Sequence, residues 1–277
     1  YVGIVELGGA GAVLLWHGHE MLFGFASAIV IGTLLTALPS WAGIAEVHGV
    51  RLAALVCAWL GGRGVMWAAP WLPPWMVAGA DLLLWLLVTA MLARPLWQLQ
   101  DRRYRWLLPI MAVFLIANAT YHLAAIQGDA VAAERALRAA VWTLMLLFSL
   151  NGGVLTPVFT GNALRALGRG DVPRVSMPLE VVAAALLVAL AAADVARTNA
   201  ALVSLLALAN AGAQGVRVAR WRGWRVLDQP LLPSLHLGFV WLLLALLLKA
   251  AAELGAAVPE PAWIHVFTVG ALGAAAD

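Results

Sequence analysis

The chain has 277 residues, of which 64% are hydrophobic and 11% are charged, and its mean hydropathy is +0.91. A soluble domain carries roughly a quarter charged residues, so this composition excludes a water-soluble fold. The formal net charge is +3 and the isoelectric point is near 9.6. Because the arginines mostly lie between apolar runs, where they orient membrane helices, we expect no nucleic-acid partner.

The order of apolar runs predicts the fold. Residues 1–16 are glycine-rich and too short to span a bilayer, so we expect an interfacial loop there. The later runs reach the ~20 residues that a transmembrane helix needs and lack the period-2 alternation of a transmembrane barrel. We expect an all-α, polytopic transmembrane helix bundle, with about eight complete spans, a partial ninth and a single transmembrane domain over residues 1–277. The predicted spans are 18–38, 50–69, 73–93, 105–125, 136–157, 176–194, 198–216 and 231–252, with a ninth beginning near 262.

The arginines are distributed unequally between the two ends of these spans. Four belong to one side: Arg63, Arg135, Arg138 and Arg197. Twelve belong to the other: Arg51, Arg94, Arg102, Arg103, Arg105, Arg165, Arg169, Arg174, Arg217, Arg220, Arg222 and Arg225. By the positive-inside rule, the arginine-rich side is cytoplasmic.

With this orientation, the histidines can be compared by depth. His236 lies about one turn inside the inner end of the eighth span, and His48 lies in an inner loop. The other four histidines share one level near the outer surface: His17, His19, His122 and His265. Imidazole is a common metal ligand and is poorly accommodated by lipid, so this shared depth favours a buried metal or haem centre over four independent interfacial histidines.

The spacing within this group sets limits on the centre. Residues two apart on a continuous helix point about 200° away from each other, so His17 and His19 could not both bind one ion unless the segment is extended at His17. Glu20 could orient His17 as a carboxylate behind the ligand, three residues further along the helix. Asn118 lies one turn before His122 and could either orient that histidine or join two helices.

Other polar residues within the spans have two interpretations. Asp81 falls near the middle of the predicted third span, where a carboxyl group is either part of a proton or ion path or is hydrogen-bonded between helices. Its depth predicts a structural or proton-delivery role and not metal ligation. The segment Asn151-Gly152-Gly153 with Pro157 predicts a break in the fifth span, which would line a cavity or admit a close neighbour.

The motifs of common soluble enzymes are absent. The sequence has no P-loop, no dinucleotide-binding glycine motif after a strand, no G-x-S-x-G and no H-E-x-x-H. Cys57 is the only cysteine, which excludes an intrachain disulfide, a thiolate cluster and covalent haem attachment. Whether the protein is an enzyme is left open by the sequence.

The run Trp16-His17-Gly18-His19-Glu20-Met21-Leu22-Phe23-Gly24-Phe25 resembles the W-H-x-H-E-M-x-F-G-F signature of the NnrS family. Further matching motifs follow in order, and the resemblance covers essentially the whole chain. They are Ala117-Asn118 with His122-Leu123, Asn151-Gly152-Gly153 with Pro157, His236-Leu237-Gly238 with Trp241, and His265-Val266-Phe267-Thr268-Val269-Gly270. One motif differs, because Val154 stands where the family usually has an arginine.

This resemblance implies a bacterial inner-membrane protein of about twelve spans that contains haem and copper and takes part in the response to nitric oxide. The haem would be non-covalent and b-type. The five motif histidines, His17, His19, His122, His236 and His265, would bind the cofactors, and the family pattern does not say which metal each one binds.

Three functions are compatible with these observations. The first is a haem and copper protein that binds NO or metal–nitrosyl species at histidine-ligated centres during nitrosative stress, with an unidentified electron donor. The second is a proton- or ion-coupled transporter that uses Asp81 and Glu20. The third is a metal-bound sensor or assembly factor without turnover.

Overall fold

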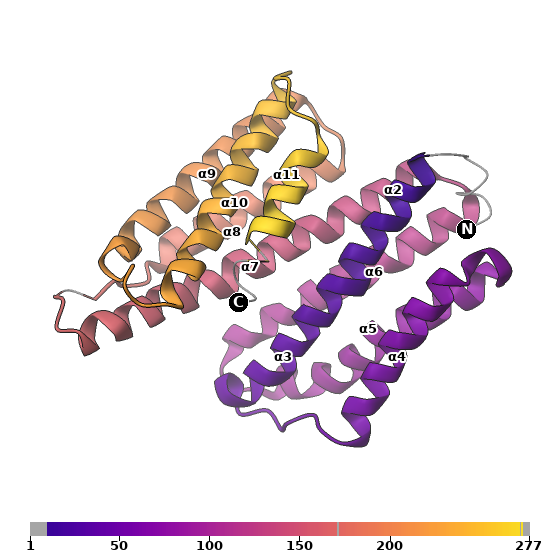
Figure 1. The fold of residues 1–277 in the computed structure, drawn as a ribbon, viewed down its shortest axis with the longest axis horizontal. Coiled ribbons are helices and arrows are strands. Elements are labelled where there is room, and N and C mark those ends of the chain that lie inside the picture. The colour runs from indigo at the N-terminus through magenta and orange to yellow at the C-terminus, as the bar shows by residue number, and fades with distance from the viewer. Residues whose placement is uncertain (1–9, 171, 272, 274–277) are drawn as a thin grey trace. The chain divides into compact units, whose positions relative to one another are not determined.

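The computed structural model describes residues 10–170, 172–271 and 273, and these residues form helices joined by short turns and contain no strand (Figure 1). The all-α prediction is confirmed. Eight helical segments are long and apolar enough to cross a membrane, which confirms the number of complete spans. Helix α11 and the π-helical η5 begin another apolar segment near the predicted start of the ninth span.

The chain divides into two compact units, residues 1–143 and 144–277, and the long helix α7 (Ala130–Ala166) contributes to both. Whether they act as one transmembrane domain stays a prediction. The first unit contains α2 (Ala10–His19), the π-helical η1 (Glu20–Ala26), α3 (Ser27–Ala42), α4 (Val50–Trp67), η2 (Ala69–Trp71), α5 (Pro74–Gln98), η3 (Arg102–Trp106) and α6 (Leu107–Gln127). Here α5 packs between α4 and α6, and η1 packs on α4.

The second unit contains α8 (Met177–Val195), α9 (Ala200–Trp221), η4 (Gly223–Arg225), α10 (Leu232–Glu253), α11 (Pro261–His265) and the π-helical η5 (Val266–Ala271). Helix α9 packs against both α8 and α10, and η5 packs on α10.

The predicted loop over residues 1–16 is wrong for its described part. Helix α2 begins at Ala10, because residues 10–16 contain a single glycine, Gly11, among alanine, valine, leucine and tryptophan residues that favour a helix in lipid. Residues 1–9 of the predicted loop lie outside the described residues. His19 therefore lies about 13 Å along the helix from its start and not at its edge.

The depth predicted for Asp81 is also wrong. Helix α5 continues to Gln98, several residues beyond the predicted end of the span at 93, and it tolerates Pro95 within its last turn. The middle of α5 therefore lies beyond Asp81, which is about two turns from the outer end of the helix. His122 lies about one and a half turns from the end of α6 at Gln127, so the carboxyl group and the histidine share a level.

Two arginines counted with the ends of the spans make ion pairs inside the helix bundle of their unit. Arg63 is in α4 and Arg217 is in α9, and both make ion pairs in the interior. Removing one from each group leaves the direction of the arginine asymmetry unchanged. The predicted break in the fifth span is wrong, because α7 passes continuously through Asn151 and Pro157.

Candidate metal centre

The first span of unit 1 changes its winding immediately after His19. Helix α2 ends at that residue, η1 winds as a π-helix over Glu20–Ala26, and α3 then continues. A π-helical turn accommodates an extra residue and is frequent at functional sites. His19 is fully buried and Glu20 is 9% exposed, so two adjacent side chains both face the interior of the unit.

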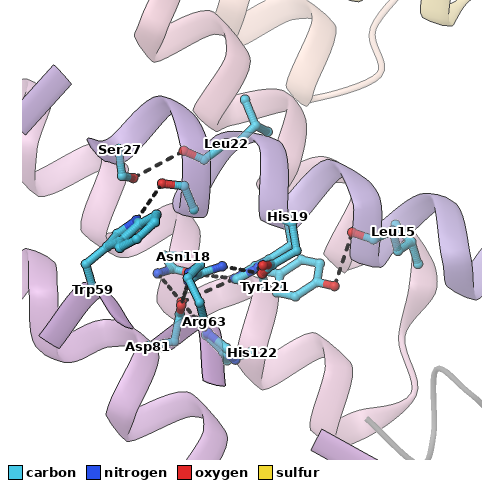
Figure 2. Close-up of polar contacts among 12 residues, drawn as sticks. Leu15, His19, Leu22, Ser27, Trp59, Arg63, Asp81, Asn118, Tyr121 and His122 are labelled. Atoms are coloured by element: carbon cyan, nitrogen blue, oxygen red, sulfur yellow. Dashed lines mark hydrogen bonds and ion pairs between the residues drawn. The ribbon is translucent and has the colours of Figure 1, made fainter. Parts of the chain in front are cut away.

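Side chains around the π-helical segment donate hydrogen bonds to its carbonyl groups (Figure 2). The Ser27 hydroxyl donates to the Leu22 carbonyl at 3.2 Å, and Trp59 Nε1 donates to the Gly24 carbonyl at 2.9 Å. Trp85 Nε1 in turn donates to Ser27 Oγ at 3.0 Å. In a bilayer, where water cannot satisfy backbone groups exposed by irregular winding, such donors stabilise the wide turn.

Asp81 connects the polar residues of three helices (Figure 2). Its Oδ2 atom lies 3.0 Å from His122 Nε2 and 3.3 Å from His19 Nε2, and it accepts a hydrogen bond of 2.8 Å from Asn118 Nδ2. Asn118 Oδ1 also lies 3.1 Å from His19 Nε2. All four residues are buried, with at most 3% of their surface exposed. The expectation that Asp81 and the histidines lie at different depths is wrong.

Arg63 on α4 reaches the same group of residues. Its Nη1 atom donates to Glu20 Oε1 and its Nη2 atom donates to Asp81 Oδ1. Glu20 Oε1 is also 3.2 Å from His19 Nδ1, so Glu20 contacts the buried histidine and not His17. We call His19, Glu20, Arg63, Asp81, Asn118 and His122 the polar cluster.

Apolar side chains flank this cluster on two sides. On one side, the rings of Phe23 and Trp85 lie 4.9 and 4.7 Å from the ring of Phe114. On the other side, the Tyr121 ring lies 4.5 Å from the His19 ring, and the Tyr121 hydroxyl donates to the Leu15 carbonyl at 3.2 Å. The same side contains the buried residues Met66, Val77, Ala124 and Ala125. The interior of the unit therefore has a low dielectric around its charged groups.

Within the described residues, His19, Asp81 and His122 are the one group of histidine, cysteine or carboxylate side chains whose ligand atoms converge as a metal site requires, with those atoms within 4.8 Å of one another. Both ring nitrogens of His19 face side-chain oxygens. Two imidazoles and a carboxylate are a donor set that suits zinc, copper or non-haem iron. Because Asp81 Oδ2 contacts both imidazoles, a haem ring has no room between the two histidines. The set therefore fits a small ion and not haem.

The remaining candidate histidines lie apart from the polar cluster or in the other unit. His17 is exposed on α2, as expected for a residue two positions from a buried histidine on a continuous helix. His48 is exposed in the loop before α4. In unit 2, His236 is 8% exposed and lies 3.0 Å from Thr160 Oγ1, while His265 is exposed and its Nδ1 atom lies 2.9 Å from the Pro261 carbonyl. Whether any of these residues binds a cofactor stays a prediction.

The glycine motif of α7 admits a close neighbour within unit 2. A Cβ atom on Gly153 would lie 1.5 Å from Arg217 Nη2, so the guanidinium group occupies the space that a side chain would need. Arg217 also pairs with Glu180, donates to the Ser149 hydroxyl at 2.8 Å and lies over the Trp221 ring. The guanidinium group of Arg217 on α9 therefore lies against the backbone of α7 at this motif.

Comparison with known families agrees with these motifs. The sequence model described as NnrS protein matches residues 2–276, nearly the whole chain. The chain belongs to the NnrS family. No curated protein and no solved structure matches the chain. NnrS membership supports a role in the response to nitric oxide, and the structure provides a His/Asp group suited to a metal in a multi-pass membrane protein.

Sequence reasoning about this NnrS protein missed two members of the site. Arg63 is counted from the sequence only as a charge on one side of the membrane, although an arginine flanked by Gly62 and Gly64 inside an apolar run needs a carboxylate partner within the membrane. Tyr121 was overlooked although it directly precedes a motif histidine. Asp81, the natural partner of Arg63, was separated from the histidines by an incorrect span boundary.

Proposed function

We propose that this NnrS protein is a bacterial inner-membrane haem and copper protein that binds nitric oxide or metal–nitrosyl species during nitrosative stress. The observation that supports the copper assignment is the convergence of His19, Asp81 and His122 in a buried, three-helix group. Family membership supports the nitric oxide role.

In the polar cluster, three residues would bind copper and others would orient these ligands. His19 and His122 offer Nε2 atoms and Asp81 offers a carboxylate oxygen as ligands. Asn118 donates a hydrogen bond to Asp81, and Glu20 contacts His19 at Nδ1, the ring nitrogen that does not face Asp81. Such outer contacts fix the ring orientation and tautomer of ligating histidines. Bound copper would supply a metal that coordinates NO.

The apolar side chains around the polar cluster suit the proposed ligand. Nitric oxide is small and neutral, so it can reach the polar cluster through lipid and past apolar side chains, whereas charged competitors are disfavoured there. These same side chains keep bulk water away from the polar cluster, which preserves the strength of its charge interactions.

We assign haem to histidines outside the polar cluster, with His265 as the leading axial ligand. An exposed imidazole within a membrane needs a polar partner or a ligand. The Pro261 carbonyl accepts a hydrogen bond from Nδ1 of His265, an arrangement that leaves Nε2 to coordinate iron. His236 and His17 are candidates for the second axial position or a second centre.

Spectroscopy of the purified full-length protein tests this function. We expect a Soret band, a b-type pyridine haemochrome spectrum, copper by elemental analysis and a nitrosyl signal by electron paramagnetic resonance after NO addition. His265→Ala should lose haem, whereas His48→Ala, an exposed loop histidine, should retain it. A protein with neither Soret band nor bound metal would overturn the proposal and favour a proton- or ion-coupled transporter that uses Asp81 and Glu20.

A further inference from the structure

Arg63 supplies the fixed positive charge of the polar cluster. Its guanidinium group bridges two carboxylates, one from Glu20 on η1 and one from Asp81 on α5. The arginine side chain is 15% exposed, and those of Glu20 and Asp81 are 10% and 1% exposed. All three charges are therefore largely removed from water, and each must be balanced inside the unit.

Two glycines make room for this ion pair, one beside Arg63 and one beside Asp81. A Cβ atom on Gly24 would lie 2.8 Å from Arg63 Nη1 and 3.3 Å from its Cδ and Cζ atoms, so the side chain lies directly on the backbone of η1. A Cβ atom on Gly62 would lie 3.2 Å from Asp81 Oδ1 and 3.4 Å from Asp81 Cα. Helices α4 and α5 thus approach closely enough for Arg63 to remain beside the proposed ligands when an ion is bound.

The fixed charges of the polar cluster determine what ion charge it can neutralise. Glu20 and Asp81 contribute two negative charges when ionised, and Arg63 contributes one positive charge because arginine stays protonated in proteins. With both imidazoles neutral, as metal ligation requires, the cluster carries a net charge of about −1. A monovalent cation makes it neutral, whereas a divalent cation leaves one uncompensated positive charge in a low-dielectric interior.

We infer that Arg63 is a specificity-determining residue that biases the centre toward monovalent cations, and so toward the reduced form of a bound copper ion. The inference rests on the proposed metal site and deepens it. One unit charge at about 6 Å in an effective dielectric of about 20 changes affinity for a monovalent ion roughly a hundredfold and for a divalent ion by the square of that factor. Removing Arg63 should therefore raise divalent affinity relative to monovalent affinity by up to roughly a hundredfold.

The test uses two redox-inert ions, Ag⁺ and Zn²⁺, titrated into the full-length protein after chelator treatment. Arg63→Gln should shift the ratio of Zn²⁺ to Ag⁺ affinity upward by roughly tenfold to a hundredfold. Glu20→Gln, which removes a negative charge, should shift the same ratio downward. Arg63→Lys should keep the ratio near that of the wild type. Arg51→Gln is the matched control, because it removes an exposed arginine from the other end of α4.

The outcomes separate this inference from the proposed function. If His122→Ala abolishes binding of both ions but the Arg63 and Glu20 variants leave the ratio within twofold, the site stands and the inference is overturned. If His122→Ala leaves binding unchanged, the metal site itself is wrong. Should Arg63→Gln fail to fold, the downward shift in Glu20→Gln still decides the question, and an upward or absent shift there overturns the inference.

Discussion

The carboxylate of Asp81 and the imidazole of His122 meet at 3.0 Å, between helices α5 and α6, in a part of unit 1 where both side chains are buried. This contact makes Asp81 part of the candidate site. It also replaces the expectation, drawn from depth, that Asp81 has a structural or proton-delivery role and is not a metal ligand.

Asp81→Asn should lower both metal content and stability. The substitution removes the charge that faces His19, His122 and Arg63, and breaking a buried ion pair costs about 3–5 kcal/mol. We expect at least a fivefold loss of bound metal and a lower apparent unfolding midpoint in detergent. Glu46→Gln, which neutralises an exposed loop carboxylate, should change neither. Normal metal content in Asp81→Asn would restore a purely structural role for this residue.

Gly24→Ala tests whether the guanidinium group of Arg63 must lie on η1. The added methyl group would approach Arg63 Nη1 to 2.8 Å, and we expect a loss of about 1–3 kcal/mol in unfolding free energy because the guanidinium group is displaced. Gly32→Ala is the control, since no atom lies within 4 Å of its new Cβ and alanine favours helix by up to about 1 kcal/mol. Equal unfolding midpoints for the two variants would contradict this packing.

The fold is easier to predict from the sequence than the site, because hydropathy extends over a whole helix whereas a site depends on the positions of single side chains. Hydropathy predicts the eight spans because each signal extends over a whole helix. The direction of His17 away from His19 follows from helical geometry alone. The meeting of Arg63, Glu20 and Asp81 depends on helix ends being known to within one turn and on which helices are neighbours. Periodicity supplies neither, so the sequence gives Asp81 the wrong depth and does not identify the carboxylate partners of Arg63.

An ion pair on the arginine-rich side joins two loops and gives a pH prediction. Arg169 pairs with Asp228 at 2.5 and 2.7 Å, and the guanidinium group lowers the pKa of Asp228 to about 2. A depressed carboxyl pKa adds stability above the unfolded value near 3.8, and this stability is lost as the pH falls toward 2. Asp228→Asn should therefore have a lower unfolding midpoint than the wild type at pH 6, and the difference should vanish near pH 2. In an Arg169→Gln background, a persisting difference would show that Asp228 acts through another contact.

Membrane orientation follows from the arginine asymmetry and can be measured independently of any cofactor. A reporter fused after Arg222 should be cytoplasmic, and one fused after Val258 should be periplasmic. Alkaline phosphatase and green fluorescent protein fusions distinguish the two compartments. The opposite pattern would reverse the side from which the polar cluster is approached, because His19, Asp81 and His122 all lie nearer the ends of their helices that face the same side as Val258.

The copper content of single histidine variants tests the proposed centre most directly. It is measured by elemental analysis of the full-length protein after equilibration with copper. His19→Ala and His122→Ala should each lose most of the copper, because their Nε2 atoms converge with Asp81. His17→Ala and His48→Ala should retain the copper, because both residues are exposed. His17 points away from the polar cluster, and His48 lies in the loop before α4. Copper retained in His122→Ala but lost in His17→Ala would contradict the assignment of the centre to His19, Asp81 and His122.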